Sequence, residues 1–173
     1  AATGHLWDGN DERGVYKTTD GGKTWARILF VDKDTGCADL AIDPQEPNIL
    51  YAAMWQFRRK PYFFTSGGPG SGLYKSTDAG KTWKQIKNGM PEGELGRIAL
   101  AVAPSRPNTL YAMIEAKKSG FYRSDDLGES WTRVSTSSSA TGRPFYFARL
   151  AVDPKDYKTI YKPDFSFAVS TDG

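Results

Sequence analysis

A motif of eight residues that ends in tryptophan occurs three times in this chain of 173 residues, and it begins a fourth time at Ser170. The complete copies occupy residues 18–25, 76–83 and 124–131. Their third residue is always aspartate, and the four aspartates are 58, 48 and 46 residues apart. Repeats of about 40 to 50 residues are typical of a unit of four β-strands that stacks on its neighbours. The repeat therefore predicts a row of similar small sheets.

A second motif recurs between the copies of the first. It occupies residues 41–52, 101–112 and, more loosely, 151–161. Each copy runs from an apolar segment through a proline-containing turn to a segment with a tyrosine. Proline restricts φ in a way that favours turns, and asparagine tolerates left-handed backbone geometry. Two motifs with one spacing indicate a true structural repeat.

The best-defined repeat, residues 96–134, divides into four segments of strand length. Their apolar patterns suit strands of a sheet that packs against other sheets. We find no helical periodicity in the chain. We therefore predict an all-β fold, a partial β-propeller of about three and a half blades with four antiparallel strands in each blade. The prediction is a single domain over residues 1–173, with approximate blades at 1–36, 37–90, 91–140 and 141–173, the last incomplete.

The aspartate motif can be explained as a turn that satisfies its own polar groups. Its aspartate and the preceding Ser or Thr can accept hydrogen bonds from backbone N–H groups, and its glycine allows a positive φ. The tryptophan offers an apolar face for packing between sheets. A calcium or carbohydrate site is the functional alternative, but repetition in every unit favours the structural role. The residues concerned are Asp20, Gly22, Trp25, Asp78, Gly80, Trp83, Asp126, Gly128, Trp131 and Asp172.

These motif residues resemble the Asp-box or BNR repeat, Ser/Thr-x-Asp-x-Gly-x-Thr-Trp. That repeat is found in sialidases, oligoxyloglucan-type glycosidases, photosystem assembly factors and sortilin-type receptors. The longer context at residues 14–25 and 51–60 is most similar to bacterial BNR propellers called sortilin-like or glycosyl-hydrolase-like. The resemblance implies that the boxes lie at the outer edge of each blade and that their aspartates are not catalytic. It also implies a secreted or periplasmic protein and a longer parent, of which this chain would be a fragment.

Composition excludes several classes of function. The 23 basic and 20 acidic residues are scattered, so no basic block suggests binding to nucleic acid. No apolar run approaches the roughly 20 residues of a membrane-spanning helix, so we expect no membrane insertion. Cys37 is the single cysteine and His5 the single histidine. No intrachain disulfide can form, and we expect no histidine-based metal centre and no cofactor.

Two segments rich in aromatic and basic residues are the best candidates for ligand binding. The first is an insertion in the first repeat interval, at residues 55–64, and the second lies at residues 143–149. Aromatic rings can stack on sugars or grip a peptide, and arginines can bind carboxylate or phosphate. The alternative is that the rings fill gaps between blades and the cations lie at a solvated rim. The candidate ligand-binding residues are Trp55, Arg58, Arg59, Tyr62, Arg97, Arg143, Tyr146 and Arg149.

Two functions are the main candidates on these residues, and a third, an assembly factor similar to the photosystem proteins, rests on the shared repeats alone. The first is a non-catalytic binding or scaffold module, part of a sortilin-like propeller that recognises a peptide, protein or glycan. The alternative is a fragment of a BNR-type glycoside hydrolase, sialidase-like or xyloglucanase-like, that acts on polysaccharide through two carboxylates about 5 to 10 Å apart. Asp39, just before an apolar strand, is then the best-placed carboxylate outside the boxes, ahead of Asp8, Asp11, Glu92, Glu94 and Glu115. Self-association or the remaining blades of a parent chain would cover the open blade faces.

Overall fold

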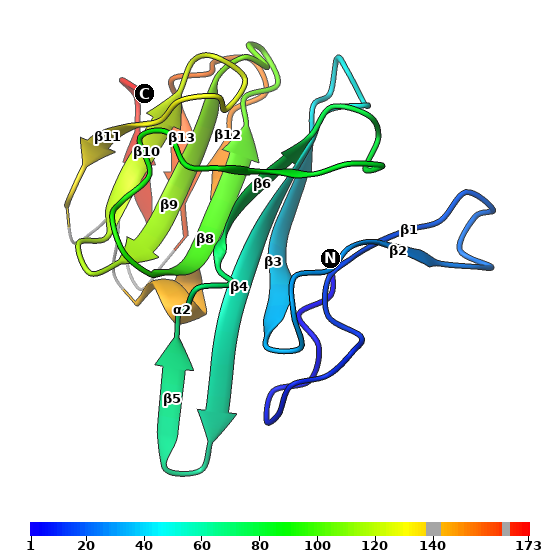
Figure 1. Ribbon diagram of the computed structural model, residues 1–173. Helices are drawn as coiled ribbons and strands as arrows, with labels where there is room; N and C mark the ends of the chain where they lie inside the picture. Colours follow the sequence, from blue (N-terminus) through cyan, green and yellow to red (C-terminus); the bar gives the residue numbers. More distant parts are fainter. Residues whose placement is uncertain (138–142, 164–166) are drawn as a thin grey trace.

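The computed structural model describes residues 1–137, 143–163 and 167–173, and its regular structure is almost entirely antiparallel sheet (Figure 1). The described strands fall into four sheets that follow one another along the chain. The first sheet pairs β1 (Val15–Lys17) with β2 (Ala26–Leu29). The second has the order β3 (Thr35–Ile42), β4 (Leu50–Lys60), β6 (Gly72–Ser76) and β7 (Lys84–Ile86), with β5 (Phe63–Ser66) paired to the far end of β4.

The third sheet is the most regular unit. Its order is β8 (Leu95–Val102), β9 (Leu110–Ala116), β10 (Gly120–Ser124) and β11 (Thr132–Ser135), so each strand pairs with the next along the chain. The fourth sheet contains β12 (Ala151–Val152), β13 (Ile160–Lys162) and β14 (Ala168–Ser170). Four-stranded antiparallel units of this kind are propeller blades, and the predicted all-β fold is confirmed. The described strands close no barrel.

One element was not predicted. A four-residue helix, α2 (Pro144–Phe147), precedes the fourth sheet, although the sequence has no helical periodicity. One helical turn is too short to display a 3.6-residue period, and proline is well tolerated in a first turn. No helix in the described residues is long and apolar enough to cross a membrane.

Alternation along β9 explains why neighbouring sheets pack together. Leu110 and Ile114 point into a cluster shared with the second sheet, which includes Tyr51. The intervening residues, Tyr111 and Met113, point into a cluster shared with the fourth sheet. Because side chains alternate between the two faces of a strand, β9 is buried on both sides. The core is therefore divided into layers between successive blades, and it is not one central body.

The Asp boxes are closed turns, as their sequence suggests. Both carboxylate oxygens of Asp78 accept hydrogen bonds from Thr82, at 2.9 Å from the backbone nitrogen and 2.6 Å from the hydroxyl. Ser76 Oγ accepts a hydrogen bond from Gly80 N at 2.9 Å. Ala79 and Gly80 both have positive φ, at 59° and 86°. The hydrogen bonds from the Thr82 side chain and backbone lower the pKa of Asp78 to about 2, which keeps it ionised and makes it unfit as a general acid near neutral pH.

The boxes also join the two sequence motifs within each sheet. The residue after the box aspartate donates its N–H to a carbonyl in the proline turn of the same sheet. This bond is 2.9 Å from Ala79 to Asn48, 3.0 Å from Leu127 to Asn108 and 3.1 Å from Gly173 to Lys158. The common spacing of the two motifs therefore has a structural cause, because each pair forms one edge of one blade.

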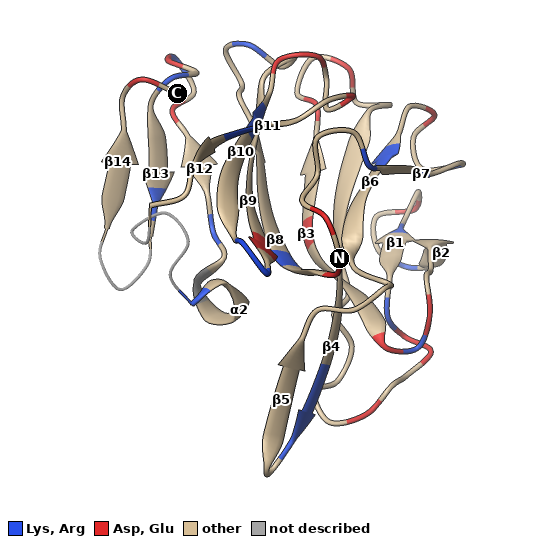
Figure 2. Cartoon of the chain, turned by 60° about the vertical axis from the view of Figure 1, so that its left-hand side comes forward, with Lys and Arg blue, Asp and Glu red and all other residues tan. Residues whose placement is uncertain are grey.

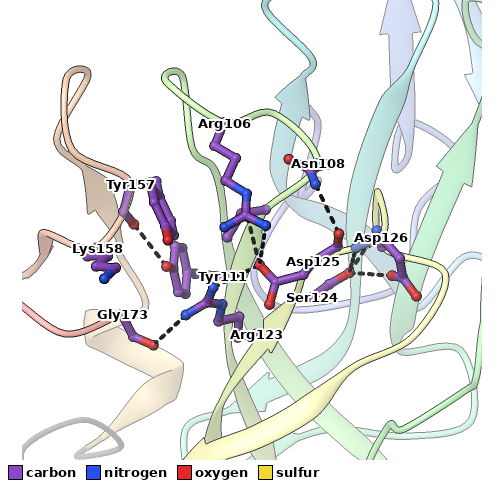
Figure 3. Close-up of polar contacts among 12 residues, drawn as sticks. Arg106, Asn108, Tyr111, Arg123, Ser124, Asp125, Asp126, Tyr157, Lys158 and Gly173 are labelled. Atoms are coloured by element: carbon purple, nitrogen blue, oxygen red, sulfur yellow. Dashed lines mark hydrogen bonds and ion pairs between the residues drawn. The ribbon is translucent and has the colours of Figure 1, made fainter.

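The same residue joins neighbouring blades. Its carbonyl accepts a hydrogen bond from the preceding sheet: Ala79 from Lys17 Nζ at 2.9 Å, Leu127 from Tyr51 OH at 2.9 Å, and Gly173 from Arg123 Nη1 at 3.4 Å. Figure 3 shows the last of these contacts. The left-handed conformation after the aspartate orients this carbonyl toward the neighbour, so the box acts as a link between blades.

Candidate functional site

The insertion in the second sheet forms a projecting hairpin. β4 pairs with β6 only over Leu50–Met54, and its far end pairs with β5 instead. Figure 1 shows this hairpin extending beyond the other strands of the sheet. Tyr62 at its tip is 84% exposed. The hairpin therefore presents side chains away from the repeated core.

The basic residues of the hairpin fall into two groups with different partners. Lys60 Nζ lies 2.6 Å from Asp8 Oδ1, and Arg58 is paired with both Asp8 and Asp34. Arg59, between them, instead donates a hydrogen bond from Nη1 to the hydroxyl of Tyr146 at 2.9 Å. The sequence grouped Arg58 with Arg59, and the structure separates them because adjacent strand residues point to opposite faces.

Arg59 connects the hairpin to the segment around α2. Its guanidinium lies 5.4 Å from the ring centroid of Phe64, and Phe64 lies 5.3 Å from Phe145, centroid to centroid. Tyr146 is half exposed, at 50%. The two aromatic and basic segments that the sequence singled out are thus brought together. Figure 2 shows basic residues both along the hairpin and beside α2.

Trp55 is buried beneath the contact between the hairpin and α2. It is only 7% exposed, stacks on Phe57 at a centroid distance of 4.3 Å, and donates from Nε1 to Ser66 Oγ at 3.0 Å. The Arg97 guanidinium lies 5.2 Å from its ring centroid and donates from Nη1 to the carbonyl of Phe145 at 2.9 Å. A direct stacking role for Trp55 on a ligand is therefore not supported, because its ring is already covered.

Glu115 lies beside Trp55 and Arg97, beneath the contact between the hairpin and α2, and links β5 to β8. Its Oε2 accepts hydrogen bonds from Ser66 Oγ at 2.6 Å and from Arg97 N at 2.8 Å. Gly96 permits this approach, since a Cβ at that position would lie 2.3 Å from the same oxygen. The sequence placed Glu115 among six candidate carboxylates without preferring it. Its position depends on the β4–β5 insertion and on β8, which no local pattern connects.

Asp39 has a different environment from the one predicted. It lies at a bulge in β3, where its Oδ1 accepts from Leu40 N and its Oδ2 from Leu100 N, both at 3.0 Å. Leu100 belongs to β8, so the carboxylate ties the first strands of two sheets together. Both carboxylate oxygens of Asp39 accept hydrogen bonds from backbone N–H groups, and this arrangement favours a structural role.

Four arginines surround the meeting point of the hairpin and α2. Burial, followed by the charge of Arg149, lowers the pKa of Arg97, while Asp39 and Glu115 oppose that shift. Arg143 and Arg149 are exposed, and the Arg143 guanidinium lies 5.5 Å from the ring centroid of Tyr146. Arg143 has a φ of 37°, an uncommon conformation for a residue with a side chain. We call the following set the arginine–aromatic surface: Arg59, Phe64, Arg97, Arg143, Phe145, Tyr146 and Arg149.

This surface can bind a ligand by ring stacking and by hydrogen bonds from guanidinium groups. Tyr62, at the hairpin tip, contacts Phe63, which pairs with Lys60 on the face opposite to Arg59. Within residues 1–137, 143–163 and 167–173, no three His, Cys, Asp or Glu side chains are grouped to hold a metal ion.

Comparison with known proteins places the repeats in a described class. A family model called BNR/Asp-box repeat matches residues 16–27 and 74–85. The chain therefore contains BNR/Asp-box repeats, and its sheets have the arrangement of β-propeller blades. Solved structures similar to it include GH74 enzymes. The GH74 xyloglucanase from Xanthomonas campestris has a TM-score of 0.64 at 22% identity, over 95% of this chain and 24% of that one. The GH74 enzyme from Niastella koreensis has a TM-score of 0.62 at 22% identity, over 97% and 26%.

Two curated relatives match parts of the chain. A probable oligoxyloglucan-reducing end-specific xyloglucanase from Neosartorya fischeri is 37% identical over 89 residues, which are 48% of this chain and 10% of that protein. The dispase autolysis-inducing protein of Streptomyces mobaraensis is 32% identical over 111 residues, or 62% and 26%. The chain thus spans about a tenth to a quarter of the length of these relatives. The structural likeness, at low identity, establishes the fold.

Proposed function

We propose that this propeller acts on a polysaccharide as a glycoside hydrolase and that its arginine–aromatic surface binds the glycan. The comparisons favour this function over the sortilin-like scaffold that the sequence ranked first, because one relative and one structural neighbour are named as xyloglucanases and another neighbour is named as a GH74 enzyme. One structural observation carries the proposal. Arg59 and Tyr146, from two different repeats, are joined at 2.9 Å and form an exposed surface of ring and guanidinium.

The proposed roles follow from exposure and from hydrogen bonding. Tyr146 and Tyr62 are 50% and 84% exposed, and they offer ring faces on which sugar rings can stack. Arg59 positions the Tyr146 hydroxyl. Glu115 is the carboxylate closest in contacts to this surface, and its two hydrogen bonds within the described chain both use Oε2. We assign Glu115 ahead of Asp39 as a carboxylate that can face substrate, because Asp39 uses both oxygens on backbone N–H groups.

Release of reducing ends from a panel of polysaccharides that includes xyloglucan tests this proposal. We expect turnover that falls at least tenfold in Tyr146→Ala, which removes an exposed ring of the proposed binding surface, and in Glu115→Gln, which removes the carboxylate in contact with that surface. Asp39→Asn should chiefly lower thermal stability. Absence of both binding and turnover on every glycan of the panel would contradict the proposal.

A non-catalytic module is the second candidate, and one finding favours it. The Streptomyces mobaraensis relative is named for its effect on a protein, dispase. In that case the same surface would bind a protein or peptide, and glycans would neither bind nor be cleaved. Binding of glycan without cleavage would instead point to a carbohydrate-binding scaffold.

A secreted or periplasmic location is part of the same proposal, and the similarity to glycoside hydrolases supports it.

A further inference from the structure

We propose that the arginine–aromatic surface selects an acidic polysaccharide, one whose sugar rings carry carboxylates, over a neutral glycan. The inference rests on the proposed function and names the class of glycan that this surface fits. It differs from the xyloglucanase names of the relatives, and it is drawn from the charge of the surface itself.

The first observation is that three arginines of the surface form no ion pair within the described residues, although the carboxylates of Asp39 and Glu115 act on Arg97 through their charge. The ion pairs found among residues 1–137, 143–163 and 167–173 include none formed by Arg59, Arg97 or Arg149. Arg58 and Lys60, on the other face of the same hairpin, are both paired with Asp8. Along β4, Arg58 and Lys60 are therefore paired with acidic side chains, and Arg59 between them is not.

The second observation is that neutral groups hold these guanidiniums in place. Arg59 donates to the Tyr146 hydroxyl and lies over Phe64. Arg97 donates to the Phe145 carbonyl and lies over Trp55. Stacking and hydrogen bonds to neutral oxygens orient a guanidinium without cancelling its charge. Both side chains are therefore ordered before a ligand arrives, and the charge of Arg59 remains available.

A third observation concerns Arg97 directly. Its Nε is buried and has no hydrogen-bond partner in the described chain. A buried donor without a partner is costly, and such groups in native proteins call for an explanation. The positive charge of Arg149 disfavours the charged form of Arg97, whereas the carboxylates of Asp39 and Glu115 favour it. A ligand carboxylate near these two arginines would relieve their repulsion.

The ligand class follows from the combination of groups. The planar fork of arginine matches a carboxylate, with which it can form two parallel hydrogen bonds. The exposed ring of Tyr146 and the tip residue Tyr62 suit the apolar faces of sugar rings. A carboxylate and a pyranose ring in one repeating unit describe a uronic acid polymer. A neutral glycan would satisfy the rings and leave Arg59 and Arg149 without an ion pair.

The test compares polygalacturonate with its methyl ester, because esterification removes the charge and keeps the sugar. Dissociation constants are measured by isothermal titration for both polymers, for xyloglucan and for dextran sulfate. We expect polygalacturonate to bind about tenfold more tightly than its ester, which corresponds to one net charge-assisted contact. It should also bind more tightly than dextran sulfate, which carries more charge but no carboxylate. Equal binding of polygalacturonate and its ester, or tighter binding of dextran sulfate, would overturn the inference.

Matched variants locate the effect. Arg59→Gln and Arg149→Gln should each reduce the ratio of affinities for polygalacturonate and its ester toward one. Lys60→Gln is the control, since it removes the same charge from the same hairpin but on the face paired with Asp8. An equal loss in Lys60→Gln would show attraction by overall charge and would overturn the assignment to this surface.

The outcomes also separate this inference from the proposed function. Turnover or binding of xyloglucan with no preference for the acidic polymer would leave the proposed function standing and remove the inference. Failure to bind any of the glycans would remove both.

Discussion

The two ends of β4 differ in how their polar groups are satisfied. At the Leu50 end lie the Asp box of residues 76–83 and its proline turn, where carboxylate, hydroxyl and backbone groups are paired with one another. At the Lys60 end lies the projecting hairpin, where Arg59 is held by neutral partners and retains its charge. The repeated end stabilises the propeller. At the non-repeated end, the Arg59 guanidinium can still bind a ligand. Function in a repeat fold is expected in such non-repeated insertions.

The largest expected effect concerns the tryptophans of the boxes. Trp131 is 4% exposed and packs between the second and third sheets, whereas Trp25 is 60% exposed. Trp131→Ala should lower the free energy of unfolding by about 3 to 5 kcal/mol, the usual cost of a cavity of this size. Trp25→Ala should change it by less than about 0.5 kcal/mol. Urea denaturation measures both, and similar losses in the two variants would show that the boxes stabilise the blades independently of their neighbours.

The second prediction tests the structural assignment of Asp39. Asp39→Ala leaves Leu100 N without its acceptor, so unfolding should become easier by about 1 to 3 kcal/mol. Glu92→Ala, at an exposed carboxylate, is the control and should be close to neutral. A variant of unchanged stability that has lost all turnover would instead identify Asp39 as catalytic.

The third prediction addresses the other end of β4. Tyr146→Ala should weaken glycan binding by roughly tenfold while the melting temperature stays within a few degrees, because the ring is half exposed. Trp7→Ala matches it, since Trp7 is also 50% exposed and lies outside the arginine–aromatic surface. Titration and thermal unfolding of both variants check the prediction. Equal loss of binding in Trp7→Ala would point to a ligand site elsewhere.

The smallest expected effect is the acid sensitivity of a single box. Hydrogen bonds from Thr24 and Thr82 lower the pKa values of Asp20 and Asp78 to about 2, below the roughly 3.9 of an unfolded chain. Depressed acid pKa values stabilise the fold above pH 4, and that contribution is lost as the pH falls toward 2. Asp78→Asn should therefore show a smaller drop in melting temperature between pH 5 and pH 2.5 than the parent protein. An unchanged drop would mean that other carboxylates control acid unfolding.

Local features of the sequence predicted the Asp-box end of β4 and the other repeated turns. Each box depends on residues within eight positions, as the bonds from Asp78 to Thr82 illustrate, so its geometry can be read from spacing alone. The site was harder to predict. The sequence singled out Arg59 and Tyr146 but could not join them, because they are 87 residues apart and meet only through packing of three sheets. It could not assign Trp55 to the interior or Asp39 to a bulge, since both depend on a neighbouring blade.

We assign ligand binding to the hairpin end of β4 and stabilisation of the fold to the Asp-box end. Hydrogen–deuterium exchange in the presence and absence of polygalacturonate oligosaccharides tests this assignment most directly. Protection is expected at residues 57–66 and 143–149, with the Asp boxes at 18–25, 76–83 and 124–131 unchanged. Protection confined to the boxes would contradict it, because the ligand would then be bound by the repeated edge to which we assign a structural role.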